Sequence, residues 1–238
     1  MTRPDAAALF AALEATWPAA RVIPHGPWTL REGQGGGKRV SAATAGPGAG
    51  PADIASAETG MEAMGQTPLF MIRPGEEALD AALAARGYRI VDPVMLYLTA
   101  LDGTQPAAAP MTTFPIWPPL AIMIETWNDT GIDAARIAVM ERACAPRTAV
   151  MARVRDRVSG CAFVAVDGDI AMLHALETLP GFRRQGSANN MLRRAAAWSR
   201  DQGANWLSLA VTTANAPARA LYASFGMEVV GEYHYRMK

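Results

Sequence analysis

The chain has 238 residues, which is the length of one large domain or two small ones. Half of the residues are apolar, so the chain can bury a core and is not disordered. The 22 basic and 22 acidic side chains give a formal net charge of zero, whereas a nucleic-acid-binding protein needs a basic surplus. No apolar run approaches the roughly 20 residues of a membrane span, and the N-terminus lacks the apolar core of a secretory signal. We therefore expect a cytoplasmic protein that binds neither nucleic acid nor membranes.

Cysteine and histidine are too few and too scattered for a disulfide framework or a metal site. The two cysteines, Cys144 and Cys161, do not have CxxC spacing, so we expect two reduced thiols. The three histidines, His25, His174 and His234, lie far apart in the sequence. A resident metal ion is therefore not expected.

The first hundred residues alternate predicted helices and strands. The patterns predict helices over Asp5–Trp17, Ala52–Met64 and Glu76–Ala85, a short apolar run over Leu69–Ile72, and a strand over Tyr88–Thr99. Gly87 stands where a left-handed residue would end the third helix. The glycine-rich segment Gly33–Gly37 is expected to form a turn, because Arg39 stands where a Walker phosphate-binding loop requires Ser or Thr.

A proline-rich stretch, Asp102–Pro119, follows these elements. Its five prolines lack amide donors and fix φ, which is typical of a linker or an extended arm. We therefore predict an N-terminal domain over residues 1–101, a linker over 102–119 and a C-terminal domain over 120–238.

The C-terminal half has a clearer pattern of elements. Strands are predicted over Leu120–Ile124, Thr148–Arg155, Val158–Val166, Ile170–Leu179, Trp206–Thr212 and Met227–Arg236, and helices over Asp133–Ala143, Gly186–Gln202 and Ala216–Phe225. Tight joints at Asp156-Arg157 and Asp167-Gly168 connect three successive strands, which indicates an antiparallel meander.

The loop from Leu179 to Ala188 lies between a predicted strand and a predicted helix, and it contains the pattern Arg-x-x-Gly-x-Ala. The first amides of a helix have no partner within the helix and carry partial positive charge, so they can surround a pyrophosphate. Gly186 lets the backbone approach a phosphate, Ala188 is small for the same reason, and Arg183 and Arg184 add positive charge. An ordinary strand–helix turn with two solvated arginines would show the same short pattern.

A second motif, Asn215-Ala216-Pro217-Ala218-Arg219-Ala220-Leu221-Tyr222, opens the last predicted helix, which Asn215 would cap. Together the two motifs resemble the GNAT superfamily of N-acetyltransferases, whose pattern is Pro-x-x-Arg-x-x-Gly-x-Gly/Ala followed by Asn-x-x-Ala-x-x-Leu-Tyr-x-x-x-Gly-Phe. Only the end departs from this pattern, where Phe225-Gly226-Met227 stands in place of Gly-Phe. The resemblance covers about Leu120–Lys238.

The resemblance implies an α/β (α+β) fold, the GNAT fold, in which a mixed, mostly antiparallel sheet is flanked by helices. It also implies acetyl-CoA as cosubstrate, bound where the strand before the loop splays from the next strand. The implied contacts are backbone groups of Leu176, Thr178 and Leu179 along the pantetheine arm, Arg183, Arg184, Gln185, Gly186, Ser187 and Ala188 around the pyrophosphate, and Asn215 and Tyr222 near the thiol end.

Three residues are candidates for proton transfer. The resemblance makes Tyr222 the acid that protonates the leaving thiolate, since a phenol of ordinary pKa is protonated at neutral pH; packing is the alternative role for this ring. The strand around His174 is locally similar to that of the arylalkylamine N-acetyltransferases, which carry two histidines there, whereas Met172 stands at the second position here. His174 is one candidate base, with a structural role as the alternative, and Glu177 is the second candidate.

The first hundred residues show a weaker resemblance to N-terminal halves of two-domain bacterial GNAT proteins, carried by Gly26–Arg31 and Ala82–Tyr88. This half would be a degenerate GNAT-like domain without a cofactor. The leading hypothesis is an acetyl-CoA-dependent N-acetyltransferase acting on a primary amine of a small molecule or peptide by direct attack in a ternary complex. A non-catalytic acyl-CoA-binding regulatory module is the alternative, a scaffold that binds an adventitious anion is another, and a homodimer is left open.

Overall fold

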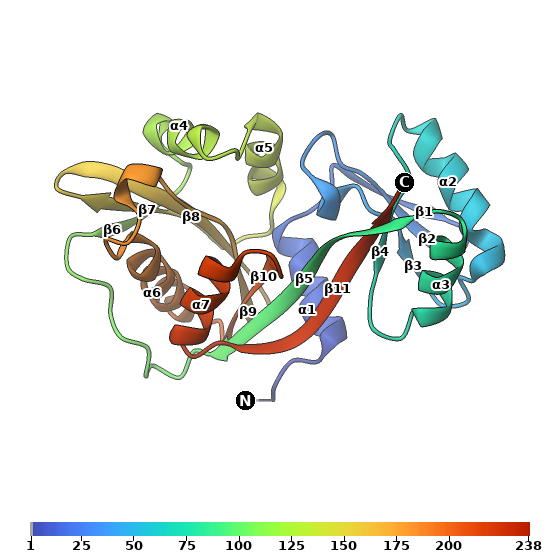
Figure 1. Ribbon diagram of the computed structural model, residues 1–238. Coiled ribbons are helices and arrows are strands. Elements are labelled where there is room, and N and C mark those ends of the chain that lie inside the picture. Colours follow the sequence, from blue (N-terminus) through green and yellow to red (C-terminus); the bar gives the residue numbers. More distant parts are fainter. Residues whose placement is uncertain (1) are drawn as a thin grey trace. The chain divides into compact units, whose positions relative to one another are not determined.

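The computed structural model describes residues 2–238, and the chain divides into two compact units (Figure 1). Unit 1 contains residues 2–18, Leu96–Val211 and Ala216–Val230, and unit 2 contains Ala19–Met95, Thr212–Asn215 and Gly231–Lys238. Two long strands, β5 (Arg89–Ala100) and β11 (Glu228–Met237), contribute residues to both units. Each unit is therefore assembled from segments that are distant in the sequence.

A mostly antiparallel sheet forms the centre of unit 1. Its strands, in spatial order, are β6 (Thr113–Ile116), β7 (Arg147–Val154), β8 (Arg157–Asp167), β9 (Ile170–Thr178) and β10 (Trp206–Thr212). Strands β6 to β9 pair antiparallel with one another, whereas β10 runs parallel to β9. Two-residue turns at 155–156 and 168–169 connect β7, β8 and β9, so the predicted meander is confirmed.

Helices cover both faces of this sheet. They are α1 (Ala6–Thr16), α4 (Ala121–Asp129), α5 (Ala134–Arg142), α6 (Ser187–Asp201) and α7 (Ala216–Ser224). From α6, Met191 lies against Gly160 of β8. Trp17, which ends α1, packs edge-on against Phe163 of the same strand. Since Gly160 and Phe163 are an odd number of residues apart on β8, α6 and α1 lie on opposite faces. The expected sheet flanked by helices is therefore confirmed.

An aspartate side chain caps the start of two helices of unit 1. The Asp5 carboxylate accepts a hydrogen bond from the Ala8 amide at 2.8 Å, and the Asp133 carboxylate accepts one from the Arg136 amide at 3.1 Å. Each bond satisfies an amide that has no acceptor within the helix. The predicted helices over Asp5–Trp17 and Asp133–Ala143 are confirmed as α1 and α5.

Unit 2 combines a small sheet, two helices and the remaining strands. It contains β1 (Arg21–His25), β2 (Trp28–Glu32), β3 (Thr44–Ala45), α2 (Ile54–Ala63), β4 (Leu69–Ile72) and α3 (Glu77–Ala85), with short 3₁₀ turns at Lys38–Val40 and Pro51–Asp53. β1, β2 and β3 form one antiparallel sheet, while β4 pairs antiparallel with β11. Phe70 lies between the rings of Trp28 and Tyr88, with centroid distances of 5.3 and 5.4 Å, and α2 and α3 add Ile54 and Leu83 to this core.

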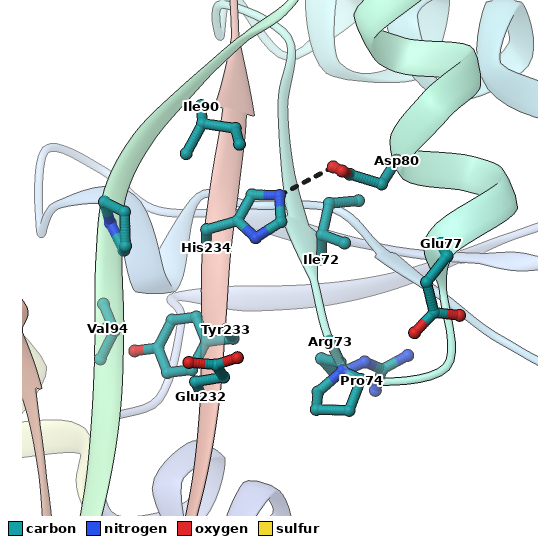
Figure 2. Close-up of a pocket in the computed structure, with 11 residues that line it drawn as sticks. Ile72, Arg73, Pro74, Glu77, Asp80, Ile90, Val94, Glu232, Tyr233 and His234 are labelled. Atoms are coloured by element: carbon teal, nitrogen blue, oxygen red, sulfur yellow. Dashed lines mark hydrogen bonds and ion pairs between the residues drawn. The ribbon is translucent and has the colours of Figure 1, made fainter.

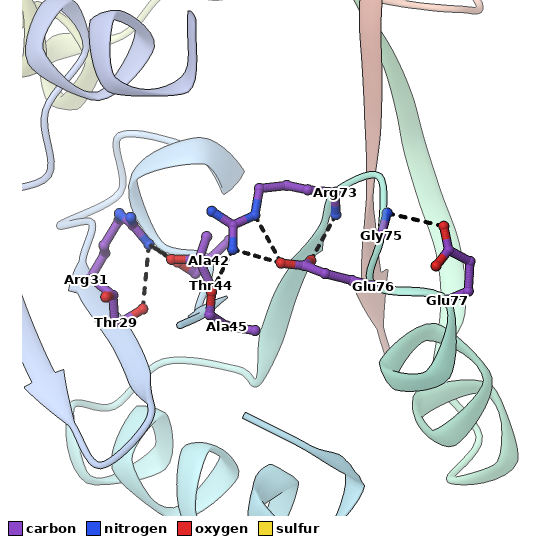
Figure 3. A network of polar contacts seen from close by, with 9 residues as sticks. All are labelled: Thr29, Arg31, Ala42, Thr44, Ala45, Arg73, Gly75, Glu76 and Glu77. Carbon is purple, nitrogen blue, oxygen red and sulfur yellow. Dashed lines mark hydrogen bonds and ion pairs between the residues drawn. The ribbon is translucent and has the colours of Figure 1, made fainter. Parts of the chain in front are cut away.

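Two arginines tie the segments of unit 2 together (Figure 3). The buried Arg31 donates to the carbonyl of Ala42 at 3.0 Å and to the hydroxyl of Thr44 at 2.9 Å. Arg73 donates to the carboxylate of Glu76 and to the carbonyl of Ala45. These contacts join β2 and β4 to the segment around β3, because a buried guanidinium must keep its donors occupied.

Two predictions about residues 102–124 are wrong. Leu120–Ile124 is not a strand; Leu120 is the extended residue before helix α4, whose buried Met123, Thr126 and Trp127 follow a helical spacing. The proline-rich stretch is not only a linker, because it contains strand β6, which pairs with β7 at one end of the order. Pro115 is tolerated there since a strand at the end of a sheet needs fewer amide donors.

The boundaries of the compact units differ from the predicted boundaries at 101 and 120. Residues 2–18 belong to unit 1, and 231–238 belong to unit 2. No local sequence pattern shows to which unit these terminal segments belong, since that assignment depends on contacts between distant parts of the chain. Within residues 2–238, no helix combines the length and apolar character needed to cross a bilayer.

Candidate active site

Strands β9 and β10 pair along only part of their length. Their parallel register runs from Ile170 and Trp206 to Leu173 and Leu209, whereas β9 continues to Thr178. Across the described residues, no pairing between the two strands is recorded beyond Leu173. The backbone of the second half of β9 is therefore open on its β10 side.

Leu176 and Thr178 are the residues whose backbone groups face that open side. The amide of its neighbour Leu179 donates to the carbonyl of Ser159 at 3.0 Å, so Leu179 points toward the β8 side. Because backbone groups alternate along a strand, those of Thr178 point away from β8. The Leu179 carbonyl also accepts from the Phe182 amide at 2.9 Å. Leu179 therefore lacks the available backbone groups expected of it, while Thr178 and the half-buried Leu176 have them.

A bulge interrupts β9 immediately after His174. Phe163 of β8 pairs with His174 and Cys161 pairs with Glu177, so three steps along β9 match two along β8. The bulge residue Ala175 has a φ of 47°, and its carbonyl accepts from the buried indole Nε1 of Trp127 at 2.9 Å. Strict alternation would place His174 and Glu177 on opposite faces, but their partners on β8 are two residues apart. The bulge therefore brings both candidate bases onto one face of the sheet.

The loop after β9 presents a helix N-terminus to solvent. It contains a 3₁₀ turn over Pro180–Phe182. The side-chain amide of Gln185 closes this turn by donating from Nε2 to the Gly181 carbonyl at 3.1 Å. Gly186 is the residue before α6; its φ of 86° lies in the left-handed region, and it brings no side-chain cap to the helix. The nearest atom to a Cβ built on Gly186 is Nδ2 of Asn190, at 3.9 Å, so the space above this backbone is open.

Four other side chains of the loop differ in their surroundings. Arg183 and Arg184 are exposed, so both place positive charge beside the start of α6. The hydroxyl of Ser187 is turned inward, where it bonds the hydroxyl of Ser159 at 2.9 Å. Ser187 therefore offers an outside ligand only its amide, and the half-buried Ala188 likewise offers no polar side chain.

Tyr222 of α7 is influenced by the charge of Glu177 in β9. Tyr222 is buried, and its ring packs against Tyr97 with a centroid distance of 5.7 Å. Burial raises the pKa of the Tyr222 phenol, and the charge of Glu177 raises this pKa further. Burial also raises the pKa of the Glu177 carboxyl, while the positive charges of Arg183 and Arg136 oppose that shift. The pair thus combines a phenol that keeps its proton with a carboxylate of increased basicity.

His174 is enclosed by aromatic side chains. It is 6% exposed, its ring centroid is 5.0 Å from that of Trp17, and it stacks on Phe163. Its Nε2 lies 2.9 Å from the hydroxyl of Thr16, which itself donates to the Ala12 carbonyl at 2.6 Å. Since the threonine proton is used in that bond, the hydroxyl oxygen accepts from His174 Nε2–H. A candidate base is thus anchored to the N-terminal helix.

The structure places Glu177, Tyr222 and the 180–188 loop together in unit 1. Asn215 belongs to unit 2, where its backbone amide donates to the Thr212 carbonyl at 3.0 Å. Sequence reasoning missed Thr16, Trp127 and Ser159, which hold His174, the bulge and the loop. The apolar spacing over Asp5–Trp17 predicted the helix that carries Thr16, but no local pattern marks Trp127 or Ser159 as partners of these groups.

The residues present fit acetyl-CoA in three respects. The open side of β9 offers the backbone of Thr178 to an extended amide-containing arm. The uncapped N-terminus of α6 and the open space over Gly186 suit a pyrophosphate. The exposed Arg183 and Arg184 match its negative charge.

Comparison with known proteins agrees with this geometry. Residues 113–227 match the sequence profile of the acetyltransferase (GNAT) family. No curated protein matches the chain. Among solved structures, a GCN5-related N-acetyltransferase from Kribbella flavida is similar over 100% of this chain and 96% of its own, with a TM-score of 0.75 and 19% identity.

Two further structures show the same likeness at lower similarity. A GCN5-related N-acetyltransferase from Sphaerobacter thermophilus has a TM-score of 0.63 and 14% identity over 83% of this chain and 72% of its own. A tandem GNAT protein from the clavulanic acid biosynthesis pathway has a TM-score of 0.56 and 15% identity over 83% of this chain and 74% of its own. At these identities the similarity establishes the fold.

Proposed function

Because residues 113–227 match the model of the GNAT acetyltransferase family, we propose that unit 1 transfers the acetyl group of acetyl-CoA to a primary amine. The observation that carries this proposal is the open side of β9 beyond Leu173, which is followed by the loop to the left-handed Gly186 at the start of α6. A thioester arm lying along this edge would have its phosphates at Gly186 and its reactive end near the bulge. The acceptor is a small-molecule or peptide amine, and the location is cytoplasmic.

Each binding role belongs to a different part of the loop and strand. The amides of Gly186, Ser187 and Ala188 surround the pyrophosphate, and Arg183 and Arg184 compensate its charge. Gln185 holds the loop closed through its bond to Gly181. Along the arm, Leu176 and Thr178 supply backbone groups.

The chemistry needs one base and one acid. The acceptor nitrogen forms a bond to the thioester carbonyl carbon, the C–S bond breaks, and the nitrogen loses a proton. We assign that proton to Glu177, because burial makes its carboxylate more basic while it remains half-exposed. Tyr222 donates its phenolic proton to the leaving sulfur, since its raised pKa keeps it protonated at neutral pH. His174 is the second candidate base, although its burial and its bond to Thr16 favour a positioning role.

Calorimetry with acetyl-CoA tests the binding site. Gly186→Val places branched carbons in the open space over the loop, so we expect affinity to fall about tenfold or more. Gly203→Val is the matched control, because Gly203 follows the other end of α6 with a φ of 89° and open space around it. Both variants carry the same backbone strain, so thermal unfolding should shift similarly. Equal acetyl-CoA affinity in the two folded variants would contradict the site.

Release of free CoA in the presence of a panel of amines tests the reaction itself. An acetyltransferase releases CoA in proportion to an acceptor amine. The alternative, a non-catalytic acyl-CoA-binding module, binds acetyl-CoA with the same sensitivity to Gly186→Val but releases none. The calorimetric and kinetic results together therefore separate the site from the activity.

A further inference from the structure

Unit 2 contains a pocket of about 400 Å³ that the proposed acetyl transfer does not use. This size is within the range of small-ligand sites. Apolar side chains from β4 and β5, including Ile72, Ile90 and Val94, line part of it. His234 of β11, Asp80 of α3 and the acidic residues Glu77 and Glu232 contribute polar groups to the same pocket (Figure 2).

The imidazole of His234 is held in a fixed orientation. Its Nε2 lies 2.7 Å from the Asp80 carboxylate, which also accepts two bonds from the Arg236 guanidinium, at 2.7 and 2.8 Å. Hydrogen bonds from Arg236 and His234 lower the pKa of Asp80 to about 2, so the carboxylate is ionised and only accepts. The Nε2 of His234 must therefore carry the hydrogen. In Figure 2 the other ring nitrogen points away from Asp80, toward the side of the pocket where Glu232 lies.

The polar groups of the pocket mostly accept hydrogen bonds. With its hydrogen on Nε2, the His234 imidazole can accept at Nδ1, and Glu232 and Glu77 offer carboxylates. Within residues 2–238, neither glutamate takes part in a recorded ion pair, although Glu77 accepts from the Gly75 amide at 3.0 Å. The cation at the pocket wall, Arg73, is engaged by Glu76. A ligand that fits this pattern brings hydrogen-bond donors and positive charge to one end and an apolar body to the other.

We propose that this pocket of unit 2 binds a small aliphatic primary amine, whose ammonium group donates to His234 and Glu232 while its alkyl chain lies on Ile72, Ile90 and Val94. The two residues that orient His234, Asp80 and Arg236, support this interpretation. The Asp80–Arg236 pair is sufficient to join α3 to β11. His234, the third member of this network, places a hydrogen-bond acceptor at the pocket. The site does not depend on acetyl transfer in unit 1.

Nuclear magnetic resonance of the full chain with n-pentylamine, without acetyl-CoA, tests the proposal. The chain has three histidines, so the imidazole C2–H signals can be assigned from single variants. We expect a saturable shift of the His234 signal with n-pentylamine, and none with pentan-1-ol or pentanoate, which lack the ammonium group. A shift confined to His174 would place the amine in unit 1 and overturn this inference while leaving the proposed function standing.

Variants then locate the contact. His234→Phe keeps a planar ring but removes the acceptor, so pentylamine affinity should fall about tenfold or more. His25→Phe is the control, because His25 also lies in unit 2 and bonds Ser56; its affinity should equal wild type. Should His234→Phe fail to fold, Glu232→Gln removes an exposed charge without disturbing the core and should weaken binding severalfold. Unchanged affinity in the folded variants, or equal binding of pentan-1-ol, overturns the proposal.

Discussion

The histidines of the two units are held in different ways. His174 in unit 1 donates to a threonine hydroxyl and lies between aromatic rings, whereas His234 in unit 2 donates to an ionised carboxylate and faces a pocket. In both rings Nε2 carries the hydrogen, because the Asp80 carboxylate is ionised and the Thr16 hydroxyl donates its single proton to the Ala12 carbonyl. The difference lies in the second nitrogen: the aromatic enclosure keeps His174 from solvent, while His234 presents its nitrogen to a cavity. Proximity to the proposed reaction centre therefore does not by itself make His174 better placed than His234 to accept a proton.

The largest effect is expected from removing the phenol of Tyr222. Tyr222→Phe preserves packing against Tyr97 but removes the proton donor, so kcat should fall by roughly 100- to 10,000-fold with little change in acetyl-CoA affinity. Tyr97→Phe removes the neighbouring hydroxyl and should keep kcat within a few-fold. Steady-state kinetics under conditions where chemistry limits the rate decide this. An unchanged kcat in Tyr222→Phe would return this ring to a packing role.

The two candidate bases can be separated by their pH profiles. We expect Glu177→Gln to lower kcat by about 100-fold and to remove the acidic limb of the profile. Because burial raises the pKa of Glu177, the wild-type limb should lie above the range of an ordinary glutamate, and activity should fall as pH drops through it. His174→Gln should keep that limb and lower thermal stability. Loss of the limb in His174→Gln, with its retention in Glu177→Gln, would reverse the assignment.

A smaller effect is expected in unit 2, on stability. Asp80 has a folded-state pKa of about 2, below its unfolded value, so its ionised form stabilises the fold. Asp80→Asn should therefore lower the free energy of unfolding by about 2 kcal/mol at pH 7. The gap between wild type and variant is fully present above about pH 4 and closes as pH falls toward 2. Denaturant unfolding across this range measures it. The exposed Asp92→Asn is the control and should change stability by less than about 0.5 kcal/mol; a gap that persists at pH 2 would contradict the ionic explanation.

The smallest effect concerns the threonine that holds His174. Thr16→Val leaves the buried Nε2–H without its acceptor, so the free energy of unfolding should fall by about 1–2 kcal/mol. Thr59→Val is matched, because the Thr59 hydroxyl makes the same bond to a carbonyl four residues earlier but is exposed and contacts no histidine. Equal losses in the two variants would show that the helix bond, rather than the bond to His174, is responsible.

Local patterns in the sequence were sufficient for most elements of the site. The alternation over Ile170–Leu179, the glycine before a helical pattern at Gly186 and the motif around Tyr222 depend on residues near one another in the chain. Strand β9, helix α6 and helix α7 begin and end within one residue of their predicted bounds. Backbone conformation at a glycine turn or a helix end is set largely by such neighbours, so these features follow from sequence alone.

The tertiary structure alone decided which of these residues act together. The bonds from His174 to Thr16 and from His234 to Asp80 join residues 158 and 154 positions apart, and no local pattern specifies either pair. The same holds for the bulge at Ala175, which places His174 and Glu177 on one face although their spacing along a regular strand predicts the opposite. The apolar residues of Leu120–Ile124 are compatible with a strand or a helix. Burial of Met123 and Trp127 within unit 1 selected the helix. In each case the deciding free energy comes from burial and hydrogen bonding between distant segments, which exists only once the chain is folded.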